Sequence, residues 1–298
     1  MDTMDLALKI RERRDLLVGL ENDLTNRGTV PEVGLTTLPR LNAKLWGFPK
    51  GLTVVGSRTS HGKTSFVTQL ALDFGIQGIN TMYLSLEDTE ESLVERMFCN
   101  KYKINNFSLL RGEFNYSDSI KLGWESFKKE FIDWKLKITC GIGKTMGEVN
   151  EYINRMPSKP KVVILDYIQM TRAGKHERES LSEYIREFRE LMLVNNIRGI
   201  MCSQINRESE KHGQPSKKPT LDKLKGTGSL EENAELVLLC YWDYFYSNNE
   251  ENKHNYEILI AKNKKGPTGF YSLLYFPEHY RFEEKERETV LPIREVVV

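Results

Sequence analysis

The feature of this sequence that most constrains its fold is an alternation of short apolar runs with helical patterns along residues 52–276. Apolar runs of four to seven residues predict strands, and the early runs show little polar alternation, as strands buried on both faces do. The runs are 52–55, 81–86, 135–139, 162–165, 197–203, 235–241, 256–261 and 270–276. The helical patterns are 64–77, 89–102, 148–156 and 178–195. This alternation predicts an α/β fold, with a mostly parallel twisted sheet flanked by helices on both faces.

The two ends of the alternating region carry different signals. The last two runs are joined by Gly266 to Gly269, which predicts a β-hairpin at the sheet edge. Residues 1–25 carry apolar side chains near a helical period, which predicts a short amphipathic helix packed on the main body or on a neighbouring subunit. We therefore expect a helical lead or subunit linker at 1–31, a main domain at 32–283 and a tail at 284–298.

Composition excludes several classes of protein. The chain has 43 Lys and Arg against 42 Asp and Glu, and 39% hydrophobic residues, which argues against wholesale disorder and against a uniformly basic surface. No apolar run reaches about 18 residues, and the N-terminus MDTMDLALKIRERRD lacks the apolar centre of a signal peptide. We therefore expect a cytoplasmic protein with no membrane contact. The scattered cysteines argue against a metal site or disulfides, and Cys202 and Cys240 are expected to be buried.

The most specific motif is a strand, loop and helix around Gly62-Lys63-Thr64. The pattern GxxxxGK[ST] would place a glycine at Ser57, whereas the chain has Gly56 one residue earlier. Backbone N–H groups of 58–64 and the following helix N-terminus still suit the phosphates of ATP. The alternative is a glycine-containing turn without a ligand. The candidate ATP-binding residues are Ser57, Arg58, Thr59, Ser60, His61, Gly62, Lys63, Thr64 and Ser65, and residues 57–64 are called the phosphate loop below.

Charged and hydroxyl groups complete this predicted site. Lys63 would reach the β- and γ-phosphates, and Thr64 would bind Mg²⁺. Asp166 ends a buried aliphatic run, where a carboxylate can also hold Mg²⁺, although such a residue is otherwise a helix cap or turn residue. Glu87 ends another run and could deprotonate the water that attacks the γ-phosphate. The alternative for Glu87 is a favourable charge in the first turn of a helix.

The order of six motifs resembles the RecA-like motor domain of DnaB-family replicative helicases over residues 32–283. The motifs are SRTSHGKT at 57–64, SLED at 85–88, ILDYIQ at 164–169, CSQINR at 202–207, GTGSLE at 226–231 and AKNKKGP at 261–267. The resemblance implies a RecA-like fold, a hexameric ring with ATP and Mg²⁺ between subunits, and hydrolysis that drives translocation on single-stranded DNA and unwinding of duplex during replication.

The resemblance also implies catalytic roles. Glu87 matches the catalytic base, Arg96 an arginine that supports the water and γ-phosphate, and Gln204 a γ-phosphate sensor. Lys262 and Lys264 match two residues that reach the neighbouring subunit's γ-phosphate. The family commonly has arginine where Lys264 stands, so either this lysine acts as the finger, another residue replaces it, or turnover is weak. The alternatives are an exposed helix arginine for Arg96 and a basic hairpin turn for 262–265.

A basic segment follows Gln204. Residues 211–225 contain five lysines and one acid, Asp222, which suits sequence-independent contacts with phosphates. The resemblance places this segment in the DNA channel, whereas the alternative is a solvated loop. The candidate DNA-binding residues are Arg207, Lys217, Lys218, Lys223, Lys225, Thr227 and Gly228.

Only about 30 residues precede the motor-like region, whereas the resembled helicases usually carry a helical primase-binding domain there. We therefore expect a minimal, phage-type motor, encoded by a phage with a bacterial host, that forms a homo-oligomer on single-stranded DNA. Primase, a helicase loader and a polymerase are further candidate partners. Two alternatives stay open: a nucleic-acid-binding or helicase-loading ATPase with weak turnover and no unwinding, and a recombination-mediator or clock-type ATPase.

Overall fold

The computed structural model describes residues 31–140, 144–166, 177–205, 218–221, 224 and 227–285, together with 13, 14, 17, 18 and 21. The chain divides into two compact units, 1–32 and 33–298. In the first unit the described residues between 13 and 21 are helical and exposed, and the rest of the predicted helix lies outside the described residues. Across the described part of the chain, no helix is both long and apolar enough to cross a bilayer.

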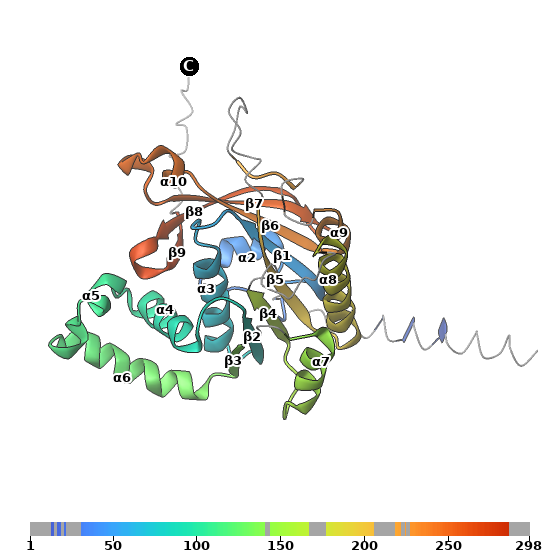
Figure 1. Ribbon diagram of the computed structural model, residues 1–298, viewed down its shortest axis with the longest axis horizontal. Coiled ribbons are helices and arrows are strands. Elements are labelled where there is room, and N and C mark those ends of the chain that lie inside the picture. Colours follow the sequence, from blue (N-terminus) through green and yellow to red (C-terminus); the bar gives the residue numbers. More distant parts are fainter. Residues whose placement is uncertain are drawn as a thin grey trace, which may run out of the picture. The chain divides into compact units, whose positions relative to one another are not determined.

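The second unit is built on a nine-stranded sheet in the order β3-β2-β4-β5-β1-β6-β7-β8-β9 (Figure 1). The strands are β1 (Gly51–Ser57), β2 (Thr81–Ser85), β3 (Leu136–Cys140), β4 (Val162–Asp166), β5 (Arg198–Gln204), β6 (Leu236–Trp242), β7 (Asn255–Asn263), β8 (Gly269–Phe276) and β9 (Arg281–Glu284). The first six strands in the sheet order pair in parallel, and the last three are antiparallel additions. The predicted α/β fold with a mostly parallel sheet is confirmed.

Parallel pairing brings the carboxyl ends of the central strands to one edge of the sheet. Ser57, the last residue of β1, is in register with Gln204 at the end of β5. Ser85 at the end of β2 is in register with Asp166 at the end of β4. Polar residues far apart in sequence therefore meet along this edge, which is where ligands bind in open α/β sheets.

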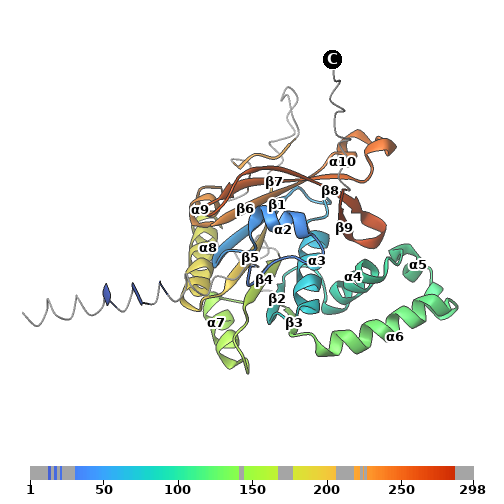
Figure 2. The ribbon, with the colours of Figure 1, turned by 180° about the vertical axis from the view of Figure 1, so that it is seen from behind.

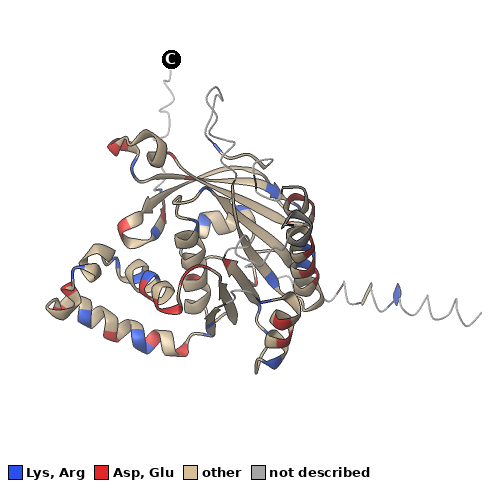
Figure 3. Cartoon of the chain, viewed as in Figure 1, with Lys and Arg blue, Asp and Glu red and all other residues tan. Residues whose placement is uncertain are grey.

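Helices cover both faces of the sheet, and the views from front and back agree on their division (Figures 1 and 2). One face carries α2 (Pro39–Leu45), α3 (Lys63–Ile76), α4 (Glu90–Tyr102), α5 (Asn106–Leu110) and α6 (Asp118–Asp133). The other carries α7 (Met146–Arg155), α8 (Glu177–Val194) and α9 (Thr227–Asn233). Charged residues gather on the outer surfaces of α6, α7 and α8, whereas the strands carry few (Figure 3).

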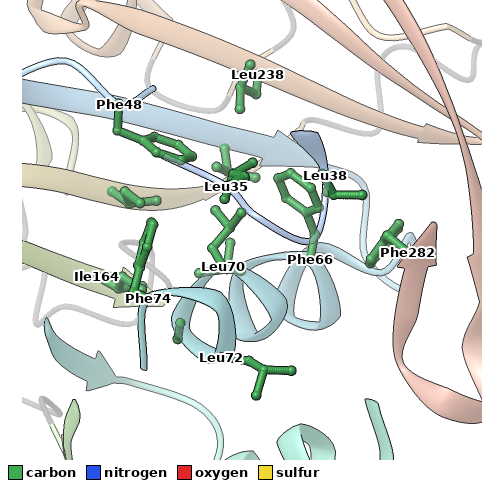
Figure 4. Close-up of a cluster of buried hydrophobic side chains, with 14 of the residues drawn as sticks. Leu35, Leu38, Phe48, Phe66, Leu70, Leu72, Phe74, Ile164, Leu238 and Phe282 are labelled. Carbon is green, nitrogen blue, oxygen red and sulfur yellow. The ribbon is translucent and has the colours of Figure 1, made fainter. Parts of the chain in front are cut away.

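Each face of the sheet has its own hydrophobic cluster. On the α3 face, Phe66, Leu70 and Phe74 project from the helix toward the β1 strand and pack with Leu38 and Phe48 (Figure 4). The second cluster joins residues of α7, α8 and α9 to the opposite face of the same strands. Both faces of β1 are therefore buried along its whole length, which explains its continuous apolar pattern. Cys202 and Cys240 are buried in these strands, as predicted.

Local sequence signals account for several boundaries. Helix α7 begins at a capping box in which the Thr145 hydroxyl accepts from the Glu148 N–H, while the Glu148 carboxylate accepts from the Thr145 N–H at 2.7 Å. Helix α3 begins after Gly62, which supplies no side-chain cap. A helix N-terminus without a side-chain cap is a common place for an anion to bind.

The structure adds to or refines the sequence predictions at three elements. The predicted 256–261 and 270–276 strands do form a hairpin, but β9 pairs with β8 and is the edge strand. The run at 135–139 becomes the other edge strand, in which Ile138 alone is buried. Helix α6 has no counterpart in the predicted pattern, because it buries mainly Ile120 and Phe127 against α4 rather than a full apolar stripe.

Candidate active site

The phosphate loop connects β1 to α3 through two residues in left-handed backbone conformations, Ser60 (φ 64°) and Gly62 (φ 72°). A Cβ atom on Gly62 would lie 3.0 Å from Tyr275 Cζ, so both conformation and space require glycine there. Gly56 serves packing instead, because a Cβ on it would lie 2.5 Å from Leu224 Cδ2. The one-position departure from the phosphate-loop pattern therefore places Gly56 inside β1, and the turn itself begins after Ser57.

A cavity of about 390 Å³ opens at this edge of the sheet. Its walls come from the phosphate loop, the β2–α4 connection, the end of β5, and the aromatic residues of β6, β8 and the segment after β8. The lining residues are Ser57, Arg58, Thr59, Ser60, Gly62, Lys63, Thr64, Ser65, Glu87, Asp88, Arg96, Gln204, Trp242, Tyr275, Pro277 and Tyr280. Eleven of the predicted site residues thus share one cavity, although they come from separate segments of the chain.

Lys63 and Asp166 form a nearly buried pair beside the cavity, with 3.8 Å between Lys63 Nζ and Asp166 Oδ1. The other carboxylate oxygen, Oδ2, accepts a hydrogen bond of 2.9 Å from the Tyr83 hydroxyl. Burial, and then the charge of Asp166, raise the pKa of Tyr83 well above its ordinary value, so the phenol stays a donor. Asp166 Oδ1 is buried and accepts no hydrogen bond from the described residues.

These groups fit Mg²⁺ accompanied by phosphate. Mg²⁺ is commonly held by one or two protein oxygens together with substrate phosphates and water. Asp166 Oδ1 is an oxygen still lacking a hydrogen bond, and Thr64 adds a hydroxyl to the cavity wall. Within the described ranges no group of three or more His, Cys, Asp or Glu side chains could hold a metal by itself.

Glu87 lies in the connection between β2 and α4 and faces the cavity, while part of it stays exposed. Desolvation raises the pKa of Glu87 above its ordinary value, against the opposing charge of Lys63, and the Asp166 carboxylate adds to the rise. A raised pKa makes a carboxylate a stronger base once it is ionised. Glu87 is therefore a carboxylate of raised proton affinity on the wall of the cavity.

Arg96 of α4 also lines the cavity. Its Nη2 lies 3.5 Å from Asp88 Oδ2, and its guanidinium carbon lies 4.7 Å from the centroid of the Tyr280 ring. The ring and the carboxylate hold the guanidinium along the cavity wall, and the side chain is about three-quarters buried. This geometry differs from that of an arginine on an exposed helix face.

The end of β5 is tied to the phosphate loop at two points. The Gln204 amide donates a hydrogen bond to the Thr59 hydroxyl, and Arg58 Nη1 donates to the Ile205 carbonyl at 2.9 Å. The basic segment at 211–225 begins six residues after Ile205 in the sequence. The end of β5 and the phosphate loop are thus held together through side chains of both.

His61 belongs to the phosphate loop but its side chain is not among the cavity-lining groups. The ring is buried, with 1% exposure, and its centroid lies 4.7 Å from that of Phe245 and 5.1 Å from that of Tyr246. The His61 carbonyl accepts a hydrogen bond of 2.7 Å from the Tyr256 hydroxyl. This residue was predicted to bind ATP, and the structure places its side chain behind the loop rather than in the cavity.

Lys262 and Lys264 lie away from the cavity of their own chain. Lys262 is in register with Val237 near the start of β6, and the Lys262 ammonium donates to the Glu231 carbonyl. The Lys264 ammonium lies 2.9 Å from Glu235 Oε2. Since β6 runs parallel to β1, both lysines sit at the edge of the sheet opposite the phosphate loop.

A small ion-pair cluster surrounds Lys264. Arg189 Nη2 of α8 lies 3.1 Å from Glu235 Oε1, so one carboxylate holds two cations. Partial burial opposes ionisation of Glu235, but the hydrogen bonds from Lys264 and Arg189 outweigh it and lower the pKa of Glu235. Lys264 is thus paired within its own chain.

Most of the predicted DNA-binding residues, namely Arg207, Lys217, Lys223 and Lys225, lie outside the described residues. Lys218 is described, and its ammonium forms an ion pair with the Glu257 carboxylate and lies 4.8 Å from the Phe270 ring centroid. Thr227 begins helix α9, and Gly228 is the next residue of that helix. Lys218 is therefore fastened to β7 and β8.

Three cavity-lining aromatic residues were missed from the sequence: Trp242, Tyr275 and Tyr280. Tyr275 belongs to an apolar strand run and Trp242 directly follows another, and in such places an aromatic residue most often signals only core packing. Their contact with the cavity depends on β7 and β8 bringing the segment 275–280 beside the phosphate loop. The Tyr275 hydroxyl in fact reaches Ser65 Oγ at 3.2 Å.

Comparison with known proteins gives a consistent set of relatives. Residues 34–284 match the family model for the DnaB-like helicase C-terminal domain. The replicative DNA helicase DnaC of Bacillus subtilis is 28% identical over 295 residues, which cover 95% of this chain and 62% of that protein. The chain thus spans less than two thirds of this relative's length.

Solved structures share the fold at lower sequence identity. A DnaB-like replicative helicase, solved with its interactions with primase, superposes with a TM-score of 0.83 and 21% identity, covering 91% of this chain and 68% of that one. A second solved structure, an ATPase domain, superposes with a TM-score of 0.81 and 21% identity, covering 92% of this chain and 98% of that domain.

Proposed function

Because the chain belongs to the family of DnaB-like helicase C-terminal domains, we propose that it is the ATP-hydrolysing motor of a replicative DNA helicase. It translocates on single-stranded DNA and unwinds duplex during replication. The observation that carries the proposal is the placement of Lys63 and Glu87 on the wall of one cavity at the phosphate loop, with the buried Asp166 carboxylate 3.8 Å from the Lys63 ammonium. A strand–loop–helix turn that served packing alone would not need these three groups together.

Within this proposal, the phosphate loop binds the triphosphate of ATP. The uncapped N–H groups at the start of α3 and the Lys63 ammonium contact phosphate oxygens. Thr64 and Asp166 would hold Mg²⁺, which would neutralise charge on the β- and γ-phosphates. Arg96, held by Asp88 and Tyr280, faces the γ-phosphate side of the cavity.

Glu87 acts as the base in hydrolysis. Its carboxylate takes a proton from water, the water oxygen bonds to the γ-phosphorus, and the bond from that phosphorus to the bridging oxygen breaks, releasing ADP. The raised pKa of Glu87 suits this proton transfer. Gln204, tied to Thr59, follows the state of the γ-phosphate and passes it to the basic segment.

The position of Lys262 and Lys264 supports catalysis between two copies of the chain. Both lie at the sheet edge opposite their own phosphate loop, so any ATP that they contact would belong to a neighbouring copy. We propose a homo-oligomer, a hexameric ring, in which residues 1–31 form a linker, 32–283 the motor and 284–298 a tail. Lys264 supplies the charge of a finger without the two-pronged geometry of arginine.

Arg207, Lys217, Lys223, Lys225, Thr227 and Gly228 are proposed to contact the phosphates of single-stranded DNA in the ring channel. Contacts of this kind carry no base specificity, as a translocating motor requires. Primase, a helicase loader and a polymerase are proposed partners.

A second candidate function is an ATPase that binds nucleic acid or loads a helicase with weak turnover and no unwinding. The pairing of Lys264 with Glu235 favours it, because this lysine must leave a carboxylate before it can reach a phosphate. Removal of a finger residue lowers phosphoryl-transfer rates by about 10³–10⁵ in other enzymes.

The test compares ATP hydrolysis with and without single-stranded DNA, followed by strand separation on a forked duplex with single-stranded tails. The motor proposal expects hydrolysis that rises with DNA, and unwinding that requires ATP. DNA-stimulated hydrolysis without strand separation on any tailed fork would favour the second candidate. A hydrolysis rate that is the same with and without DNA would contradict the proposal that the basic segment contacts DNA.

A further inference from the structure

Outside the nucleotide cavity, four side chains in contact join the phosphate loop to Lys218 in the middle of the basic segment. They are His61 of the loop, Tyr246 of α10 (Tyr244–Ser247), Tyr241 of β6, and Lys218, and we call them the aromatic row. The centroids of the His61 and Tyr246 rings are 5.1 Å apart. The Tyr246 and Tyr241 rings stack at 6.0 Å with 20° between their planes, and Lys218 Nζ lies 5.9 Å from the Tyr241 ring centroid.

At one end of the row, His61 holds the strained part of the phosphate loop. The residues on either side of it, Ser60 and Gly62, both have left-handed backbone conformations. For a residue other than glycine, here Ser60, this conformation costs energy and persists only where its surroundings enforce it. The buried His61 ring is wedged against Phe245 and Tyr246, and its Nδ1 lies 3.0 Å from the Thr59 carbonyl oxygen. The α10 segment therefore braces the loop from behind.

At the other end, Lys218 fastens the basic segment to the sheet. Its ammonium pairs with the Glu257 carboxylate and lies over the Phe270 ring. Tyr241 and Glu257 are register partners across β6 and β7. The same pair of strands therefore carries the carboxylate and the tyrosine ring that Lys218 contacts. Tyr241 is itself 7% exposed, and its hydroxyl donates to Asp243 Oδ1 at 2.8 Å. A displacement of Lys218 would thus reach Tyr241 directly.

We propose that Lys218 and His61 are positioning residues at the two ends of this aromatic row, through which anchoring of the basic segment strengthens ATP binding at the phosphate loop. Packed side chains with few alternative arrangements carry such coupling between sites. The row is separate from the Gln204–Thr59 contact, which joins the phosphate loop to the end of β5. The proposal rests on ATP binding at the phosphate loop, which is part of the proposed function.

The test measures the affinity of the full chain for a fluorescent ATP analogue with Mg²⁺ and without nucleic acid. Lys218→Gln is expected to weaken binding about three- to tenfold, although Lys218 is not among the cavity-lining residues. Lys285→Gln is the matched control. Lys285 lines the same polar pocket of about 240 Å³ as Lys218 and donates to Asn255 Oδ1 at 2.8 Å, but it is not part of the row.

Three more variants separate coupling from general damage. Lys218→Arg keeps the cation and should restore affinity, and Tyr246→Leu should weaken binding as Lys218→Gln does. His61→Leu combined with Lys218→Gln should lose less affinity than the product of the two single losses, because both interrupt one row.

If Lys218→Gln binds the analogue as tightly as Lys285→Gln, the coupling proposal is overturned while the proposed function stands. A role of Lys218 limited to DNA contact predicts that same result, since no DNA is present. A wild-type chain that does not bind the analogue would overturn the proposed function and this inference together.

Discussion

Lys63 Nζ lies 3.8 Å from Asp166 Oδ1, in a pair from which solvent is almost excluded. Lys63 is the first residue of α3 and Asp166 the last of β4, and β5 lies between β4 and β1 in the sheet. The pair exists because parallel strands end at a common edge. In this pair the Asp166 carboxylate partly balances the positive charge of Lys63 in the absence of phosphate.

Replacement of Lys63 by Ala is expected to abolish measurable ATP turnover and to weaken ATP binding by at least about tenfold, because a cation facing the phosphates is lost. Isothermal titration with ATP and Mg²⁺ and a phosphate-release assay measure both quantities. The matched control is Lys129→Ala, an exposed lysine of α6. Unchanged turnover in Lys63→Ala would rule out the phosphate loop as the catalytic site.

Glu87→Gln should bind ATP as the wild type does but hydrolyse it about 10²–10⁴ times more slowly, since the amide cannot accept the proton of the attacking water. Single-turnover hydrolysis separates this step from product release. Glu91→Gln, an exposed glutamate in the first turn of α4, is the control and should keep its activity. Equal rates of ATP hydrolysis in the two variants would show that Glu87 is not the base.

The pH dependence of turnover provides a separate test of Glu87. A base must be ionised to act, so turnover should fall as pH decreases through the pKa of Glu87. Because that pKa is raised, the fall should begin at a higher pH than an ordinary glutamate would give. Turnover measured across the acidic range should show this limb in the wild type and lose it in Glu87→Gln. A limb that persists in the variant belongs to another group.

The position of Lys264 predicts complementation between copies. Lys264→Ala should lower turnover strongly, and Lys264→Arg should keep or increase it, because guanidinium contacts phosphate through two parallel hydrogen bonds. Mixing Lys264→Ala with Lys63→Ala should restore part of the turnover, since some interfaces then combine an intact phosphate loop with an intact Lys264. Mixtures with no more activity than the separate variants would contradict catalysis between copies.

Substitution of Gly56 is expected to lower the stability of the fold without removing a group that takes part in hydrolysis. Gly56→Ala forces a methyl group against Leu224 and Leu239, and overpacking of this kind costs about 1–3 kcal/mol in the free energy of unfolding. Gly147→Ala in α7 is the matched control, because the nearest atom to its added Cβ is 3.8 Å away. Urea denaturation followed by circular dichroism measures both. Equal unfolding midpoints would show that the strand tolerates the extra methyl group.

Much of the fold followed from local patterns. The runs that became β1, β2, β4, β5 and β6 were predicted because a strand buried on both faces needs a continuous apolar sequence. The helix at 118–133 was missed because its partners are aromatic side chains from α4 and neighbouring segments. Among these contacts, Phe98 of α4 meets Trp124 of α6 edge to face, with 5.1 Å between the ring centroids. The sequence of α6 alone does not indicate that aromatic side chains of other segments will pack against it.

The candidate site divides in the same way. Lys63, Thr64, Asp166 and Glu87 could be predicted, because each is placed by the strand or helix next to it in the sequence. Only the tertiary structure decided that Tyr275 and Tyr280 reach the cavity, that the His61 side chain turns away from it, and that Lys264 lies at the opposite edge. These outcomes depend on the order and direction of strands in the sheet, which bring distant segments together, whereas a sequence pattern describes only neighbours along the chain.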